Sequence, residues 1–247
     1  CAARTAVSAL VWGAVHQVAS IALGALVPRK RLESLSPRDR LYLPEKVVST
    51  IHGVAVGLGA LTLPMDPAFT SDVLTQSTGR TSLLLLATAG YSVYDMVAMA
   101  WQREPPSMWG HHIATLVGTF VTLVVRRSVF FPATFLITEL TVLPANIHWV
   151  LQRFEATHTP LYAANLAFRA LAHLLFRVGI GPLVVTLAIV RHGGVAAFLR
   201  DFTALPVWLW GGNAFNVAFL SYLNVVWTMA TVKRWRNHGR KPASARR

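Results

Sequence analysis

This chain is poor in cysteine and in charged residues. Its one cysteine among 247 residues, Cys1, excludes an intramolecular disulfide and a thiolate metal cluster. Only 13% of the residues are charged, whereas soluble domains typically carry about 25%. Hydrophobic residues make up 54% of the chain and its mean hydropathy is +0.48. The composition therefore indicates a membrane protein rather than a soluble domain.

Acidic residues are also scarce. The chain has 10 Asp and Glu against 23 Lys and Arg, which gives a formal net charge of +13. In a soluble protein, such an excess would favour nucleic acid as a partner. Here the basic residues cluster at the ends of hydrophobic runs, where they set topology and contact lipid headgroups. We therefore expect membrane lipids, and no nucleic acid, as partners.

Long hydrophobic segments make up most of the sequence. A membrane-spanning helix needs roughly 20 apolar residues, and about seven segments meet or approach that length. We predict an all-α polytopic membrane protein, with a kink in the sixth helix at Gly179, Gly181 and Pro182. The predicted helices span 6–27, 44–63, 81–101, 108–125, 129–152, 161–190 and 205–232.

Basic residues in the connections predict the orientation of these helices. Most of them lie in the loop after the first helix and in the C-terminal tail, and an odd number of helices puts both on one side. We predict an outside or lumenal N-terminus and a cytosolic tail, or a matrix-facing tail in a mitochondrion. The expected location is the endoplasmic reticulum, with the mitochondrial inner membrane as the alternative. The residues are Arg29, Lys30, Arg31, Arg38 and Arg40, and Lys233, Arg234, Arg236, Arg240, Lys241, Arg246 and Arg247.

Two adjacent histidines, His111 and His112, lie at the start of the fourth predicted helix. Ionisable groups are costly inside a bilayer, so they are candidates for a functional site. At about 1.5 Å per residue, other polar residues lie at a similar depth, in the cytosolic half, and Glu139 lies nearer the midplane. A polar cavity open to the cytosol would contain them all. The residues at similar depth are His52, Asp95, His148, Asn165, Arg169 and Asn224.

Histidine takes or gives a proton near neutral pH, and it also serves as an acyl-accepting nucleophile. A buried carboxylate, Asp95 or Glu139, would orient the ring. Adjacent helical residues point about 100° apart, so one histidine of the pair acts on the substrate while the other orients it or packs. The sequence does not say which one acts. The repeated histidine boxes of membrane di-iron oxidases are missing, so we expect no metal.

A stripe of basic residues on the sixth helix marks a second part of the candidate site. Arg169, His173 and Arg177 are spaced i, i+4, i+8 and so lie on one face. Such residues face protein, water or an anion rather than lipid, and we expect the arginines to hold a phosphate of CoA or of a phospholipid. Asn146, Asn165 and Asn224 have a structural interpretation as interhelical hydrogen-bonding residues.

Several stretches taken together resemble the TLC-domain family, which includes the ceramide synthases, the translocating-chain-associated membrane protein and smaller TLC-domain proteins. The resemblance implies six core helices around a polar-lined cavity, with an additional N-terminal helix. It also implies that His111 and His112 stand where ceramide synthases have the paired histidines essential for acyl-CoA-dependent N-acylation. The stretches are Lys46–Gly53, Tyr91–Met96, His111–Thr115, Glu139–Thr141 with Asn146 and Trp149, Arg177 with Pro182, and Leu223-Asn224 with Trp227 and Lys233.

The helix after the histidine pair departs from the ceramide synthases, because Glu139 is its only acid. The chain is therefore more similar to the smaller branch of the family. We divide it into an N-terminal helix with a basic loop (1–40), a TLC domain (41–235) and a basic tail (236–247).

The leading hypothesis is a membrane lipid-related protein that acts as an acyl-CoA-dependent lipid acyltransferase, with acyl-CoA as co-substrate and no bound cofactor. The alternative is a non-catalytic lipid-binding protein or an accessory subunit of a larger membrane complex. The predicted catalytic residues are His111, His112, Asp95 and Glu139, and the predicted lipid-binding residues are His52, Asn146, His148, Arg169, His173, Arg177 and Asn224.

Overall fold

The computed structural model describes residues 1–66, 74 and 77–240, and within these residues the regular structure is entirely helical. In this described part of the chain, seven helices are long and apolar enough to cross a membrane. The prediction of an all-α polytopic membrane protein is thereby confirmed. The candidate spans are Ala2–Leu26, Pro37–Met65, Gly79–Gln102, Pro106–Val125, Phe130–Arg153, Pro160–Arg191 and Val207–His238.

Several spans consist of more than one helical element. The elements are α1 (Ala2–Leu26), α2 (Arg29–Glu33), α3 (Pro37–Leu61), η1 (Leu63–Met65), α5 (Gly79–Gln102), α6 (Pro106–Val125), α7 (Phe130–Phe135), η2 (Leu136–Thr141), α8 (Val142–Arg153), α9 (Pro160–Ala172), η3 (His173–Gly179), α10 (Ile180–Arg191), α11 (Val195–Thr203) and α12 (Val207–Arg240). Two short helices, α2 and α11, were not predicted. The tail residues Lys241, Arg246 and Arg247 lie outside the described residues.

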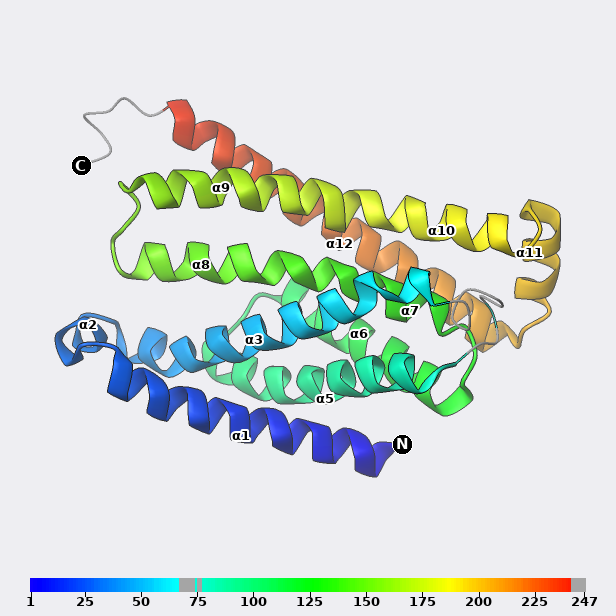
Figure 1. The fold of residues 1–247 in the computed structure, drawn as a ribbon, viewed down its shortest axis with the longest axis horizontal. Coiled ribbons are helices and arrows are strands. Elements are labelled where there is room, and N and C mark those ends of the chain that lie inside the picture. Colours follow the sequence, from blue (N-terminus) through cyan, green and yellow to red (C-terminus); the bar gives the residue numbers. More distant parts are fainter. Residues whose placement is uncertain (67–73, 75–76, 241–247) are drawn as a thin grey trace.

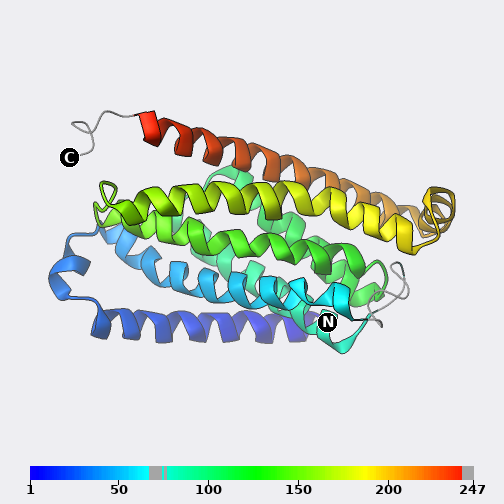
Figure 2. The same cartoon turned by 45° about the horizontal axis from the view of Figure 1, so that its top comes forward.

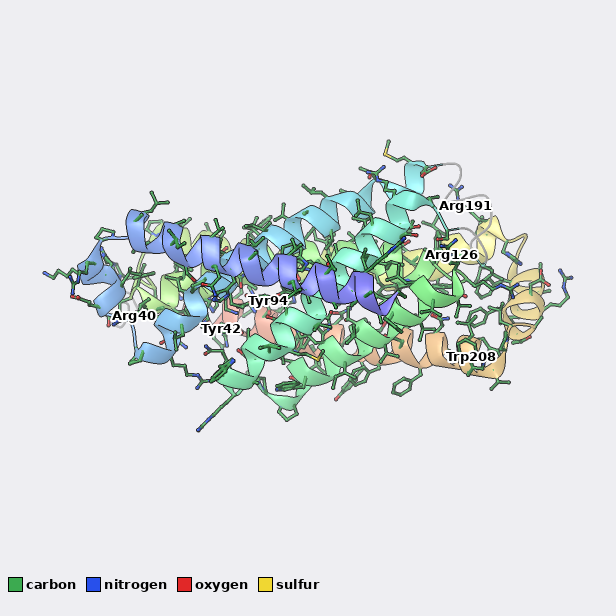
Figure 3. All side chains as sticks on the ribbon, turned by 90° about the horizontal axis from the view of Figure 1, so that it is seen from below. Arg40, Tyr42, Tyr94, Arg126, Arg191 and Trp208 are labelled. Atoms are coloured by element: carbon green, nitrogen blue, oxygen red, sulfur yellow. The ribbon has the colours of Figure 1, made fainter. Side chains whose placement is uncertain are left out.

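The spanning helices run up and down between the two ends of an elongated bundle (Figure 1). One end, here called the α2 end, holds α2, the turn between α8 and α9, and the end of α12. α11 lies at the other end, and α1 runs from the α2 end towards it, with the N-terminus stopping short of α11. The basic loop after α1 and the last turns of α12 therefore share one end, as an odd number of spans requires. Figure 3 shows Arg40 towards the α2 end and both Arg126 and Arg191 towards the opposite end.

The helices are arranged so that α1 and α12 lie on opposite sides (Figure 2). α1 packs on α5 and α3, α5 on α6, and α8 on α3 and α9, while α12 contacts α9, η3 and α6. Residues far apart in the sequence thus meet across one interior. The large apolar side chains, including Phe130, Phe131 and Phe135, gather around α7 and α10, which leaves the half nearer the α2 end for polar groups.

α3 begins at Pro37, seven residues before the predicted start. The Ser36 side chain accepts a hydrogen bond from the Asp39 backbone N–H at 3.1 Å, and Pro37 occupies the first helical position. Both features favour a helix start. The additional two turns carry Glu45 and Lys46 to about 12 Å inside the helix, at about 1.5 Å per residue. These charged residues therefore lie in the bundle rather than at its surface.

The sixth span changes its hydrogen-bonding pattern where a kink was predicted. The segment His173–Gly179 is π-helical, and α10 follows it with Pro182 in its first turn. Proline has no N–H to donate to the preceding turn, and π-helical turns occur often at functional sites. The π-helical segment carries two buried basic residues, His173 and Arg177.

Close helix packing fixes the depth of Glu139. A Cβ atom added to Gly53 on α3 would lie 2.8 Å from the Glu139 carbonyl oxygen and 3.0 Å from Val142 Cβ. One turn later, a Cβ on Gly57 would lie 2.6 Å from Leu140 Cγ. Only glycine allows α3 and η2 to approach this closely, and this approach holds η2 against the interior.

Candidate functional site

An Asp–His pair joins α5 to α6 in the polar half of the bundle. His112 Nε2 lies 2.9 Å from Asp95 Oδ2, and the two residues are only 6% and 4% exposed. Since a carboxylate oxygen accepts, Nε2–H donates and the lone pair of the imidazole is left on Nδ1. His112 Nδ1 is buried and has no hydrogen-bond partner in the described part of the chain. Nδ1 is therefore the nitrogen of this ring that can accept a proton.

His111 points in a different direction from its neighbour. Its ring meets the Trp227 ring edge-on at a centroid distance of 5.4 Å and the His112 ring at 5.0 Å. Adjacent residues of a helix point about 100° apart, which explains why only one of the two histidines reaches Asp95. The structure thus distinguishes the pair: His112 bonds the carboxylate, and His111 packs on α12.

A set of charged and aromatic residues lines the α3–α5 side of the site. The Glu45 carboxylate lies 2.9 Å from Lys46 Nζ and accepts a 3.4 Å hydrogen bond from the Tyr91 hydroxyl. Lys46 Nζ also lies 3.8 Å from the centre of the Tyr42 ring, a cation–π distance. Figure 3 shows Tyr42 in the half of the bundle nearer Arg40. We call Tyr42, Glu45, Lys46, Tyr91 and Asp95 the α3–α5 wall.

Sequence reasoning missed Glu45 and Lys46 because the predicted helix began at residue 44, which put both at the membrane surface. The signal that would have found them is Ser36-Pro37 with Asp39, a capping pattern that starts the helix two turns earlier. Burial of a Glu–Lys pair is then expected to require further partners, and Tyr91 and Tyr42 supply them.

Five basic residues form the facing side, here called the basic wall: His148 on α8, Arg169 on α9, His173 and Arg177 on η3, and Arg234 on α12. Arg177 donates from Nε to Thr141 Oγ1 at 2.6 Å and from Nη1 to Asn224 Oδ1 at 2.9 Å. Arg234 Nη1 donates to His148 Nε2 at 3.0 Å. The predicted stripe on the sixth helix therefore lies on one wall, with Arg234 added from α12.

A cavity of about 420 Å³ separates the two walls, and its lining includes both histidines of the pair, Asp95 and Glu139. Glu104, Gln152 and Arg234 also line it. Because these three residues stand at or near helix ends on the α2 side of the bundle, the cavity reaches that end. The polar cavity expected from the sequence is present, and it opens on the side that carries most of the positive charge.

A smaller pocket of about 60 Å³ continues from the inner end of this cavity. Phe131, Phe135 and Leu136 contribute to its mostly apolar lining. His111 and Glu139 line both the small pocket and the polar cavity, so they mark the boundary between a polar and an apolar compartment.

The two predicted asparagines, Asn146 and Asn224, bond residues on neighbouring helices and also line the site. Asn146 donates to the Lys46 carbonyl, Ser49 Oγ and Thr50 Oγ1 at 3.0, 2.7 and 2.9 Å, so it joins α8 to α3 while also lining the cavity. Asn224 holds Arg177 and lines the small pocket.

His52 lies apart from the cavity lining. Its ring stacks on Tyr91 at 3.9 Å between centroids, and the Trp12 ring meets it edge-on at 5.4 Å. The structure therefore puts His52 behind the α3–α5 wall rather than on its cavity face.

α1 closes this side of the site. Trp12 Nε1 donates to the Ala87 carbonyl at 3.0 Å, and His16 Nδ1 lies 2.7 Å from the Tyr94 hydroxyl. A Cβ on Gly90 of α5 would overlap Ser8 Oγ, so α1 and α5 touch through small residues. The first span thus packs directly against the helix that carries Asp95.

A family model described as TLC domain matches residues 43–233. No curated protein and no solved structure matches the chain. Across the described residues, no group of three or more His, Cys, Asp or Glu side chains is arranged to hold a metal ion. The match includes both walls of the cavity except Tyr42 and Arg234, which lie just beyond its two ends, and it leaves α1 outside.

Proposed function

The chain belongs to the TLC-domain family, and from this premise we propose that it is an enzyme that transfers an acyl group from acyl-CoA to a membrane lipid. Its membership supports a lipid-related role and its seven spans make it an integral membrane protein. One observation carries the finer proposal: a buried Asp–His pair, with a free ring nitrogen, on the wall of a cavity.

His112 is the base in the proposed reaction. As the hydroxyl or amine of the acceptor lipid attacks the thioester carbonyl carbon, its proton passes to His112 Nδ1. The C–S bond then breaks, and the leaving thiolate takes that proton back from the imidazolium. Asp95 fixes the tautomer through Nε2–H and stabilises the positive charge on the ring in between. His111 and Glu139, at the boundary of the two compartments, line the site of the reacting bond.

The two compartments fit a ligand with a polar group and a hydrocarbon chain. The cavity between the walls offers charged and hydrogen-bonding groups, and the small pocket offers phenylalanine and leucine side chains. Burial of apolar groups contributes about 0.8 kcal/mol per CH₂, so a few methylenes in the pocket would anchor an acyl chain at the boundary. Glu139 and His111 would then flank its carbonyl end.

We further propose that the α2 end faces the cytosol, in the endoplasmic reticulum. The connections and helix ends at the α2 end carry most of the Lys and Arg residues outside the bundle, and positive residues favour the cytosolic side. In the mitochondrial inner membrane, the same rule would direct this end to the matrix. Acyl-CoA is water-soluble and reaches the cavity from either of these compartments.

The test is acyl transfer by the purified protein in lipid nanodiscs. Radiolabelled oleoyl-CoA is supplied, and labelled lipid products are separated by chromatography. We expect product formation by the unchanged protein and its loss in His112→Gln. His192→Gln is the matched control, because His192 bonds a carboxylate in the same way at the opposite end of the bundle.

Two results would contradict the proposal. Full activity in His112→Gln would remove the base from the mechanism. If the unchanged protein forms no labelled lipid with any membrane composition, the chain is not an acyltransferase, and the non-catalytic role of lipid binding or complex membership takes its place.

A further inference from the structure

Cationic groups without acidic partners are concentrated on the basic wall. Arg169 Nε and His173 Nδ1 are buried and have no hydrogen-bond partner among the described residues. Arg234 donates to His148, a neutral acceptor, and none of these four residues forms an ion pair within the described ranges 1–66, 74 and 77–240. Three of the acids that line the cavity have partners elsewhere: Asp95 with His112, Glu45 with Lys46 and Glu104 with Tyr42. The fourth acid, Glu139, interacts electrostatically with Arg177, which is not one of these four residues.

Arg169 is half-buried, and its buried Nε lacks the hydrogen bond that water would give it, whereas Arg234 is exposed. Arg169 and Arg234 also repel each other, because both carry a positive charge whatever the pH. An anion between them removes both costs at once, because each guanidinium offers a planar fork of donors that matches an oxyanion. The wall is thus arranged to receive negative charge.

We infer that Arg169, His173 and Arg234, with His148 behind Arg234, form a binding site for the phosphate of a phosphate-ester ligand. A carboxylate presents two oxygens in one plane, and one bidentate arginine already contacts both, whereas a phosphate presents three or more oxygens to donors from several directions. The donors here come from three elements, α9, η3 and α12. Arg169 and His173 stand one turn apart, about 6 Å along the helix, on the same wall of the cavity.

This inference rests on the proposed function and extends it by naming the chemical class of the ligand, a phosphate ester. A phosphate on the basic wall would leave the rest of the molecule facing His112 across the cavity. Two sources share this chemistry: the phosphates of coenzyme A, which arrive from the aqueous α2 end, and the headgroup of a phospholipid, which arrives from the bilayer.

Matched pairs of probes separate the phosphate from the rest of the ligand. Coenzyme A is compared with pantetheine, and oleoyl lysophosphatidic acid with monooleoylglycerol. Binding to the purified full chain in nanodiscs is measured by isothermal titration calorimetry or native mass spectrometry. Loss of one charge-assisted hydrogen bond weakens binding about ten- to a hundredfold, so Arg169→Gln and Arg234→Gln should weaken the phosphate-bearing probe by that factor and leave its partner unchanged.

Arg236→Gln is the control, because it removes the same charge from the same turn of α12 at a residue outside the cavity lining. Unchanged affinity in Arg236→Gln supports the site. An equal loss of affinity in all three variants would show that binding depends on general surface charge, and it would overturn the proposed site. The site is also wrong if neither phosphate-bearing probe binds more tightly than its phosphate-free partner. Tight binding in the coenzyme A pair identifies a soluble ester, and in the lysophosphatidic acid pair a lipid headgroup.

Failure of this site and failure of the acyl-transfer proposal give different results. His112→Gln should abolish transfer while keeping phosphate-probe binding, because His112 is not part of the basic wall. If the unchanged protein binds a phosphate probe but transfers no acyl group, the phosphate site stands and the acyltransferase proposal falls.

Discussion

The Asp95–His112 bond can be tested by changing one atom of the carboxylate. In Asp95→Asn, the side chain keeps its shape but loses its charge, and its NH₂ group can donate to His112 Nε2. The imidazole proton then moves to Nδ1, so the nitrogen that should accept the substrate proton carries one already. In a Ser-His-Asp triad the corresponding change lowers the rate by about four orders of magnitude. We expect a loss of at least a hundredfold in acyl transfer here.

The effect on folding should be much smaller. The bond is one charge-assisted hydrogen bond of 2.9 Å between two buried side chains, and such bonds contribute about 1.5–3 kcal/mol. Asparagine retains part of this energy, whereas Asp95→Ala loses the whole bond and leaves a cavity. Equilibrium unfolding in mixed detergent should therefore show the unchanged protein as the most stable, Asp95→Asn as less stable and Asp95→Ala as the least stable. Acyl transfer should already be lost in Asp95→Asn.

A second Asp–His pair supplies the control. His192 Nε2 lies 2.9 Å from Asp201 Oδ2, at the opposite end of the bundle. Hydrogen bonds from Arg200 and His192 lower the pKa of Asp201 to about 2, so this carboxylate is ionised throughout a neutral assay. Asp201→Asn should leave acyl transfer unchanged. Full activity in Asp95→Asn, or an equal loss in Asp201→Asn, would refute the assignment of His112 as a base oriented by Asp95.

Two further substitutions test how the surrounding helices support the site. Gly53→Ala should destabilise the protein by about 1–3 kcal/mol through overpacking, because its Cβ would meet a backbone carbonyl of η2 at 2.8 Å. Gly24→Ala is the control, because a Cβ there would have no atom within 4 Å, and its stability should be unchanged. Equilibrium unfolding of both variants in detergent measures the difference. Trp12→Ala should speed hydrogen exchange of the α5 backbone, since it removes the indole that donates to α5 at 3.0 Å. Trp208 is exposed and lies at the end of the bundle away from α2, so Trp208→Ala should leave that exchange unchanged.

The sequence was sufficient to predict the membrane spans and the residue types of the site, because both depend on local patterns. Runs of apolar residues set the seven helices, and ionisable groups inside them are costly enough to be noticed. Asp95, His112 and Arg177 were found in this way. Distinguishing His112 from His111 required more, because both occupy the same depth and only the rotation of α6 against α5 decides which ring meets Asp95.

Other residues were missed because one residue type has two roles in a membrane protein. Arg234 was interpreted as a topology signal, since basic residues near a span end normally face the headgroups. α12 continues to Arg240, and the same residue also lines the cavity beside His148. A sequence without contacts cannot separate these roles. Lys46 was misplaced for a related reason: its depth depends on where α3 begins, and that is set by the cap at Ser36.

The two walls predict how their variants combine. Asp95 lies on α5 and Arg169 on α9, and within the described residues no hydrogen bond or ion pair joins the two side chains. Asp95→Asn should lower kcat, because the proton acceptor is lost, and Arg169→Gln should raise KM, because ligand binding is weakened. Distant, independent effects add in free energy, so kcat/KM of the double variant should fall by the product of the two single factors. A double variant no worse than Asp95→Asn alone would show that Arg169 acts through the same step as the Asp–His pair, which would contradict a separate phosphate site.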